Sequence, residues 1–381
     1  MAPRSTFEFT TRGNVSIFQR VVIGGFFLVL TTPLVAALIE SPPVPRPGVS
    51  PLRAAKTFLA AVSGKNRVQR QLSRVYGLGK ISLLDASPNS SVTLGRGNWL
   101  FLADRDVVAA QSLSQDRAAA WVKALSLRAA RLRAAGMSYC VMFAPAKDDV
   151  YPDQLRFPRR ESTPPGQVVA SGLQRAGVCA VFPLQALKAA KPTSEVYLRT
   201  DSHWSSFGAF VAAQAMAEAL ELPGWERLPV SELQRRRQRA DGGDLAAMLK
   251  LRADFPEQYT VFAPPTKLEA TQTSLRDAVY HPEPDGDAWT LPFVTTRAGS
   301  QRPTAVVIRD SFSTALAPFL ALEFSRAVFL QVPYYRPPGS LDRRVLEAER
   351  PDWVIQVMAD RYLGRAPEDT AAAGADSEGG L

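Results

Sequence analysis

Three side chains of this sequence have the types and spacing that nucleophilic catalysis requires. Asp201 and His203 stand two residues apart in RTDSHW, so on extended backbone their side chains leave the same face. A carboxylate placed there can fix the tautomer of the imidazole and stabilise its protonated form. Ser311 follows the apolar run TAVVIR and opens a helical pattern, where its N–H suits an oxyanion. Each pattern alone also fits a structural pair or a helix cap, but their coexistence favours a Ser-His-Asp triad.

The triad pattern lies within a regular alternation of apolar, strand-like runs and helical patterns. Such runs between helices are typical of a parallel sheet covered on both faces, with reactive side chains after the carboxyl ends of strands. Strands are expected at 99–103, 138–145, 177–184, 197–201, 304–310, 326–332 and 352–359. Helices are expected at 115–135 with Ser114 as N-cap, at 168–176, at 207–220, and from Ser311 to about 324. Residues 235–300 are expected to form a long insertion.

Composition indicates a globular protein with an anionic partner. Hydrophobic residues make up 46% of the chain and the formal net charge is +9, which suits a membrane surface or an acidic polymer. Basic residues do not alternate with aromatic ones and zinc-finger spacing is absent, so a nucleic-acid partner is not expected. The run Arg235, Arg236, Arg237 and Arg239 is expected to be a solvated helix face, with attraction of an anionic polymer as the alternative.

The N-terminal segment predicts export to the periplasm. Residues 21–39 carry no charge and are long enough to span a bilayer as a helix. Arg4, Arg12 and Arg20 precede them, so the short arm 1–20 is expected in the cytoplasm and the rest of the chain across the inner membrane. The alternative is a signal peptide cleaved near Ala37.

The remainder divides by composition into three parts. Residues 40–85 are expected to form a proline-rich linker and a basic helical segment, 86–365 the folded domain, and 366–381 a disordered tail. Cys140 and Cys179 lie in strand-like runs, where core packing is expected, with a disulfide as the alternative in an exported chain. His281 lies in a Pro/Asp-rich stretch and is expected to face solvent.

Five sequence blocks carry a resemblance to a known family. They are RGNWLFLADRD near 96–106, FAPAKDDVYPDQL near 143–155, VYLRTDSHWSSFGA near 196–209, GGDLAAML near 242–249 and VVIRDSFSTALAPFLALEFS near 306–325. In this order they resemble the periplasmic alginate O-acetyltransferase family (AlgJ/AlgX type), and the anchor places the chain closer to the membrane-tethered AlgJ-like branch. The resemblance implies an SGNH hydrolase-like α/β fold: a doubly wound parallel sheet with helices on both faces. It implies Ser311 as nucleophile, His203 as general base and then acid, and Asp201 as the orienting carboxylate.

Other residues near these blocks are candidates for contact with substrate. Trp204 is expected either to line the site and stack on a sugar, or to pack beneath the histidine loop. Lys147 and Tyr151 follow a strand at the same sheet edge and are expected to contact substrate. Arg309 stands where many SGNH proteins have glycine and is a further candidate. Asp310 is expected to hold the turn rather than to act as a fourth catalytic group.

The resemblance implies acetyl transfer to hydroxyls of an exopolysaccharide through an acetyl-serine. A membrane-bound O-acyltransferase is the implied partner that supplies the acetyl group, and no cofactor or metal is expected. Two alternatives remain: an acetyl esterase with the same triad, and a non-catalytic polysaccharide-binding subunit of an export complex.

Overall fold

The computed structural model describes residues 67–157, 162–222, 225–268, 270–275, 291–331 and 343–367. The chain divides into two compact units, residues 1–85 and residues 86–381. The described part of the first unit contains helix α3 (Arg67–Leu84), which lies in the stretch 40–85, where a linker and a basic helical segment were expected. The predicted anchor, the C-terminal tail and His281 lie outside the described residues. Within the described ranges, no helix combines the length and apolarity needed to cross a bilayer.

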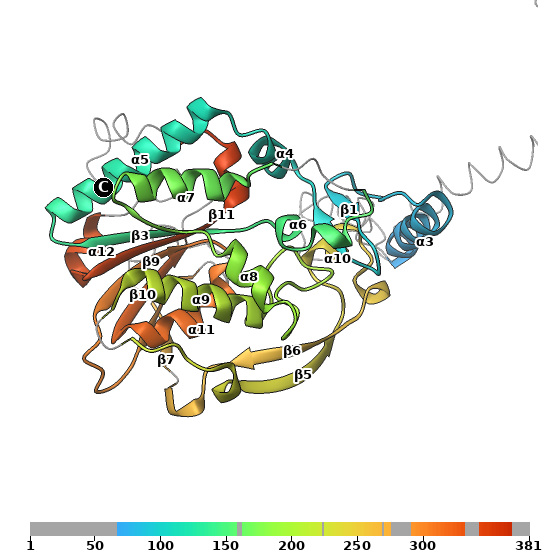
Figure 1. Cartoon of the computed structure of the whole chain (residues 1–381). Helices are drawn as coiled ribbons and strands as arrows, with labels where there is room; N and C mark the ends of the chain where they lie inside the picture. The colour runs from blue at the N-terminus through green and yellow to red at the C-terminus, as the bar shows by residue number, and fades with distance from the viewer. Residues whose placement is uncertain are drawn as a thin grey trace, which may run out of the picture. The chain divides into compact units, whose positions relative to one another are not determined.

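A seven-stranded mixed sheet forms the core of the second unit (Figure 1). Its order is β4 (Cys179–Val181), β3 (Ser138–Ala144), β11 (Trp353–Ala359), β9 (Thr304–Arg309), β10 (Arg326–Gln331), β8 (Phe293–Thr296) and β7 (Thr271–Ser274). The first five strands are parallel, as predicted. The prediction of a wholly parallel sheet is wrong, because β8 and β7 from the expected insertion add an antiparallel edge.

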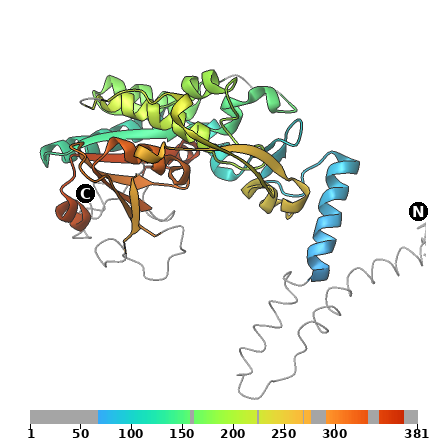
Figure 2. The ribbon, with the colours of Figure 1, turned by 90° about the horizontal axis from the view of Figure 1, so that it is seen from below.

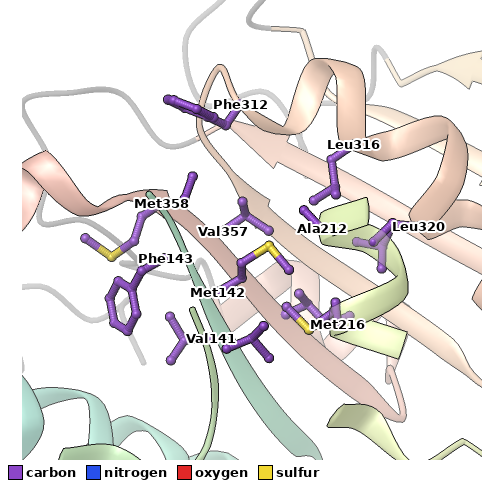
Figure 3. Close-up of a cluster of buried hydrophobic side chains, with 14 of the residues drawn as sticks. Val141, Met142, Phe143, Ala212, Met216, Phe312, Leu316, Leu320, Val357 and Met358 are labelled. Atoms are coloured by element: carbon purple, nitrogen blue, oxygen red, sulfur yellow. The ribbon is translucent and has the colours of Figure 1, made fainter. Parts of the chain in front are cut away.

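Helices cover both faces of this sheet, which is why its central strands are apolar on both sides. Helices α5 (Gln115–Ala134) and α7 (Pro165–Arg175) lie on one face, and α9 (Ser206–Leu220) and α11 (Ser313–Leu320) on the other (Figure 1). Ser114 caps α5 by accepting a hydrogen bond from the N–H of Arg117, as its position in the sequence predicts. Figure 3 shows apolar side chains of β3 and β11 packed with those of α9 and α11. The core thus fixes the strand ends that carry the site.

Shorter elements surround the edge where the parallel strands end. They are β1 (Val92–Leu94), β2 (Leu100–Leu102), α4 (Arg105–Gln111), α6 (Lys147–Val150), α8 (Leu184–Ala190) and α10 (Asp244–Met248). Helix α12 (Arg343–Glu349) lies at the opposite edge, where Glu349 pairs with Arg326 at the start of β10 (Figure 1). Strands β5 (Gln234–Ala240) and β6 (Glu257–Ala263) form a two-stranded ribbon separate from the main sheet (Figures 1 and 2).

Two expectations about local structure are wrong. The arginine run 235–239 is part of strand β5 and not of a helix, because every residue of β5 pairs with β6. Residues 197–201 do not form a strand; they contribute a single bridge, between Tyr197 and Trp204.

Cys140 and Cys179 are paired in register on neighbouring strands β3 and β4 and form a disulfide, the alternative expected of an exported chain.

Candidate active site

The predicted catalytic side chains meet at the edge where the parallel strands end. Ser311 follows β9, and Asp201 and His203 come from the loop that precedes α9. His203 contacts Asp201 through Nδ1 and Oδ1 at 2.8 Å, and contacts Ser311 through Nε2 and Oγ at 2.8 Å. The structure therefore brings the three side chains together in the order that proton transfer from a serine requires.

The charges of Asp201 and His203 stabilise each other. Burial raises the pKa of Asp201, but hydrogen bonds from His203 and the charge of its imidazolium outweigh burial and lower it to about 2. Burial lowers the pKa of His203, but the hydrogen bond to Asp201 and the charges of Asp201 and Asp244 outweigh this and raise it. The imidazole is thus a stronger base than a free histidine and is held to accept a proton.

The turn that presents Ser311 is fixed by Asp310. Its Oδ1 accepts from the N–H of Phe312 at 3.0 Å, and its Oδ2 accepts from the N–H of Ala359 at 2.7 Å. These bonds tie the end of β9 to the end of β11 and confirm the predicted turn-holding role. Among the hydrogen bonds between described residues, none uses the N–H of Ser311. This N–H is available to an oxyanion that forms at the serine.

The ring of Phe312 packs against the imidazole of His203 and against the indole of Trp204. The ring centroids of His203 and Phe312 are 4.9 Å apart, and those of Trp204 and Phe312 are 5.0 Å apart. The indole N–H of Trp204 donates to the carbonyl of Phe312 at 2.9 Å, and only 2% of Trp204 is exposed. Trp204 therefore takes the packing position of the two that were expected, beneath the histidine loop.

The positions of Lys147 and Tyr151 differ from the expected contact with substrate. Each is 5% exposed. The hydroxyl of Tyr151 accepts from the N–H of Val196 at 3.0 Å, and the ammonium of Lys147 donates to the backbone carbonyls of Leu198, Arg199 and Asp201. Both side chains point into the protein because they satisfy backbone groups of the loop that carries Asp201.

Arg309 also differs from its expected role. It is 4% exposed, its guanidinium lies 5.2 Å from the ring centroid of Phe293, and it donates to the carbonyl of Leu291 at 3.4 Å. Burial lowers the pKa of Arg309 to about 10. Arg309 is the last residue of β9, and it packs against Phe293 of strand β8 instead of entering the serine turn.

Asp244 is a residue of the site that sequence reasoning missed. Its carboxylate accepts from the N–H of Ser202 at 2.7 Å and from the hydroxyl of Ser202, and its own N–H donates to Asp201 Oδ2 at 3.1 Å. The residue before it must be glycine, because a Cβ at Gly243 would overlap the Asp201 carboxylate. The sequence signal was the GGD that begins block 242–249.

Among the described residues, Asp201, His203 and Asp244 also form a group of side chains that could hold a metal ion. One ligand atom from each lies within 4.8 Å of the others. These atoms already take part in hydrogen bonds: Asp201 with His203, and Asp244 with the Ser202 hydroxyl. Their chemistry fits a network that orients an imidazole.

Comparison with known proteins identifies the family. The family model described as the SGNH hydrolase-like domain of acetyltransferase AlgX matches residues 92–329. The chain belongs to this family. The family resemblance predicted from the sequence blocks is thereby confirmed, and the second unit has the SGNH hydrolase-like α/β fold with a mixed sheet.

Individual relatives match parts of this chain. The probable alginate O-acetylase AlgJ of Pseudomonas putida is 35% identical over 136 residues, which are 34% of this chain and 34% of that protein. The AlgJ of Pseudomonas syringae pv. tomato is 32% identical over 131 residues, 34% of this chain and 33% of that protein. The chain thus spans about a third of the length of these relatives. PatB1 of Bacillus cereus has the same fold, with a TM-score of 0.53 and 16% identity over 71% of this chain and 96% of that chain.

Proposed function

We propose that this protein is an O-acetyltransferase that transfers acetyl groups to hydroxyls of an exopolysaccharide through an acetyl-Ser311 intermediate. The observation that carries the proposal is the Asp201–His203–Ser311 array, with both contacts at 2.8 Å, in a domain of the AlgX family. The names of the AlgJ relatives, probable alginate O-acetylases, support the reaction class.

In the first half-reaction, Ser311 takes the acetyl group. Its Oγ attacks the acetyl carbonyl carbon while His203 Nε2 accepts the hydroxyl proton. The imidazolium that forms is stabilised by Asp201, and the oxyanion receives the N–H of Ser311. When the intermediate collapses, the bond to the donor oxygen breaks and His203 returns the proton to that oxygen. Acetyl-serine and the free donor alcohol result.

In the second half-reaction, a sugar hydroxyl takes the place of the donor alcohol. His203 accepts its proton, the sugar oxygen attacks the acetyl-serine carbonyl, and Ser311 leaves with the proton from the imidazolium. The product is an acetylated polysaccharide and the enzyme is restored. The same residues would hydrolyse the intermediate if water attacked instead, which is the esterase alternative.

Compartment and partners are part of the proposal. Residues 21–39 would anchor the chain in the inner membrane with the catalytic unit in the periplasm, and the Cys140–Cys179 disulfide supports an oxidising compartment. A membrane-bound O-acyltransferase would deliver the acetyl group, since cytoplasmic donors do not reach the periplasm. A reporter fused after Leu381 should then be active only if it functions in the periplasm. Activity of a strictly cytoplasmic reporter would contradict this topology.

Transfer and hydrolysis are separated by the fate of the acetyl group. The purified protein is incubated with a chromogenic acetyl ester, with and without oligosaccharide acceptors, and the products are measured by mass spectrometry. The proposal predicts acetylated oligosaccharide at the expense of free acetate. Release of free acetate alone, at the same rate with every acceptor, would favour the esterase.

A further inference from the structure

The segment that carries Asp201 has no regular secondary structure to fix its backbone. Residues 198–201 form no strand, although backbone groups removed from water must find hydrogen-bond partners. On one side of the segment, the ammonium of Lys147 donates to the carbonyls of Leu198, Arg199 and Asp201 at 3.1, 3.0 and 2.7 Å. One buried side chain therefore takes the place of a neighbouring strand.

A carboxylate binds the amide groups of the same segment. Glu257, the first residue of β6, accepts from the N–H of Arg199 at 2.8 Å and from the N–H of Thr200 at 2.9 Å. The Thr200 hydroxyl also donates to Glu257 and accepts from the N–H of Gly243 at 2.8 Å. Carbonyls of the segment thus bind a cation from α6, and its amides bind an anion from β6.

We propose that Lys147 and Glu257 are positioning residues that form a clamp of opposite charges on residues 198–201. By this clamp they set the place and the electrostatic environment of the Asp201–His203 pair. The inference rests on the proposed function, because the clamp acts on the reaction only through this pair. Neither side chain touches substrate.

Burial of both charges is the reason to assign them more than a packing role. Lys147 is 5% and Glu257 9% exposed, and charged groups lose hydration when they are buried. Ordinary strand pairing would satisfy the same backbone groups without that cost. The clamp adds what a strand cannot: a positive and a negative charge held on the segment that carries Asp201.

The hydrogen bonds of Lys147 require its charged form. Three carbonyl acceptors use all three N–H groups of an ammonium, whereas a neutral amine has only two. Burial lowers the pKa of Lys147 to about 7, and the charges of nearby carboxylates oppose this effect. These carboxylates are Asp201, Asp244, Glu257 and Asp148. The aromatic rings of Trp99 and Phe101, 5.5 and 5.2 Å from the ammonium, also favour a cation.

The test compares two clamp variants with two matched controls in the full-length protein. Lys147→Met and Glu257→Gln keep the approximate shape of each side chain and remove its charge. Lys191→Met is the first control, since Lys191 also donates to a carbonyl, that of Val150 at 3.2 Å, and to a carboxylate, but not to residues 198–201. Glu323→Gln is the second, a buried glutamate 2.8 Å from Arg302.

The first readout is the division of the effect between kcat and KM for a small acetyl ester. A misplaced Asp201–His203 pair slows proton transfer, so kcat should fall at least about tenfold in each clamp variant while KM stays near the wild-type value. The controls should keep the wild-type kcat, although Lys191→Met loses a partly buried bond to a carbonyl and Glu323→Gln loses the charge of a buried carboxylate. Thermal denaturation confirms that every variant is folded at the assay temperature.

The second readout is the pH at which activity appears as His203 loses its proton. The charged groups that act directly on His203 are Asp201, Asp244, Arg361 and Asp310. Of the clamp residues, Lys147 interacts with Asp201, Asp244 and Glu257. Lys147→Met removes a positive charge, so the pKa of His203 should rise and the acidic limb should move to higher pH. Glu257→Gln removes a negative charge, so the limb should move to lower pH. A general loss of stability would not shift the limb in opposite directions.

Sulfonylation of Ser311 by a sulfonyl fluoride separates this inference from the proposed function. The rate of labelling is measured by intact-protein mass spectrometry. Ser311 Oγ displaces fluoride from sulfur while His203 takes the proton, so the reaction needs the array but no acetyl chemistry. Wild-type labelling with slow labelling of both clamp variants supports the clamp even if acetyl transfer fails. Wild-type rates and unshifted limbs in Glu257→Gln, which is nearly isosteric, would overturn it even if Lys147→Met does not fold.

Discussion

Replacement of Asp201 by asparagine is predicted to disable the site through hydrogen bonding that the structure makes explicit. Asp201 Oδ1 accepts from the backbone N–H of His203 at 2.9 Å and from Nδ1 at 2.8 Å, and Oδ2 accepts from the N–H of Asp244 at 3.1 Å. Asparagine has one acceptor oxygen, so it cannot serve both sides. If the asparagine oxygen faces His203, its NH₂ group faces the backbone N–H of Asp244, and two donors then oppose each other. With its NH₂ toward His203, the imidazole must place its proton on Nε2 and can no longer accept the proton of Ser311.

The size of the effect follows from these losses. A charge-assisted hydrogen bond contributes about 1.5–3 kcal/mol, and population of the wrong tautomer adds to its loss. Together we expect about 3–4 kcal/mol in the activation free energy, which is about 10²–10³ in kcat. The equivalent change in a serine protease costs of order 10⁴, and an acetyl ester is more reactive than an amide.

The assay is kcat for a chromogenic acetyl ester as a function of pH. Because Asp201 holds the pKa of His203 up, the acidic limb of Asp201→Asn should also move to lower pH. A variant with wild-type kcat and an unshifted limb would show that Asp201 does not orient the base, and the reasoning from this array would fail.

Three further predictions concern the same site. His203→Ala should lose nearly as much esterase activity as Ser311→Ala, because the members of a triad act as a unit. His281→Ala should lose less than about tenfold, and the reverse ranking of the two histidine variants would show that the wrong histidine was assigned. The pKa of Asp201 lies at about 2, below its usual 3.8, so Asp201 contributes about 2 kcal/mol of stability that is present above pH ~4 and lost as the pH falls toward ~2. Urea denaturation at a series of pH values should show this loss in the wild type and less of it in Asp201→Asn, and equal losses would contradict it. Trp204→Phe removes a buried hydrogen bond and should lower the free energy of unfolding by about 1–3 kcal/mol with little change in KM, whereas an unchanged stability with a raised acceptor KM would mean that Trp204 contacts the sugar.

The sequence predicted the elements whose pattern is local. Strand β3 and helix α5 follow from apolar runs, helical spacing and the cap at Ser114, and the place of Ser311 follows from the end of β9. Asp201 and His203 lie in a loop, where the sequence indicated the end of a strand. The antiparallel strands β7 and β8 do not follow from the sequence, because their pairing depends on tertiary contacts that short, partly polar segments do not reveal. The arginine run in β5 was assigned to a helix for the same reason: its pairing with β6 is not encoded in its own residues.

The site shows a similar limit. Lys147 and Glu257 lie far apart in sequence from residues 198–201, and their hydrogen bonds replace the strand that the pattern YLRTD indicated. A lysine after a buried strand therefore looked like a substrate contact, although it points inward. Asp244 could have been found from its position after two glycines, because such close backbone approach needs the absence of a Cβ.

The covalent relay through Ser311 is the central claim, and intact mass spectrometry with peptide mapping tests it directly. The protein is mixed briefly with an activated acetyl ester, with Ser313→Ala as the matched control, because Ser313 is buried two residues further along the chain. The account predicts that the wild type and Ser313→Ala each gain one acetyl group on Ser311, which disappears when an oligosaccharide acceptor is added. Ser311→Ala should gain none. An acetyl group on another residue in the wild type, or equal turnover by Ser311→Ala, would contradict it.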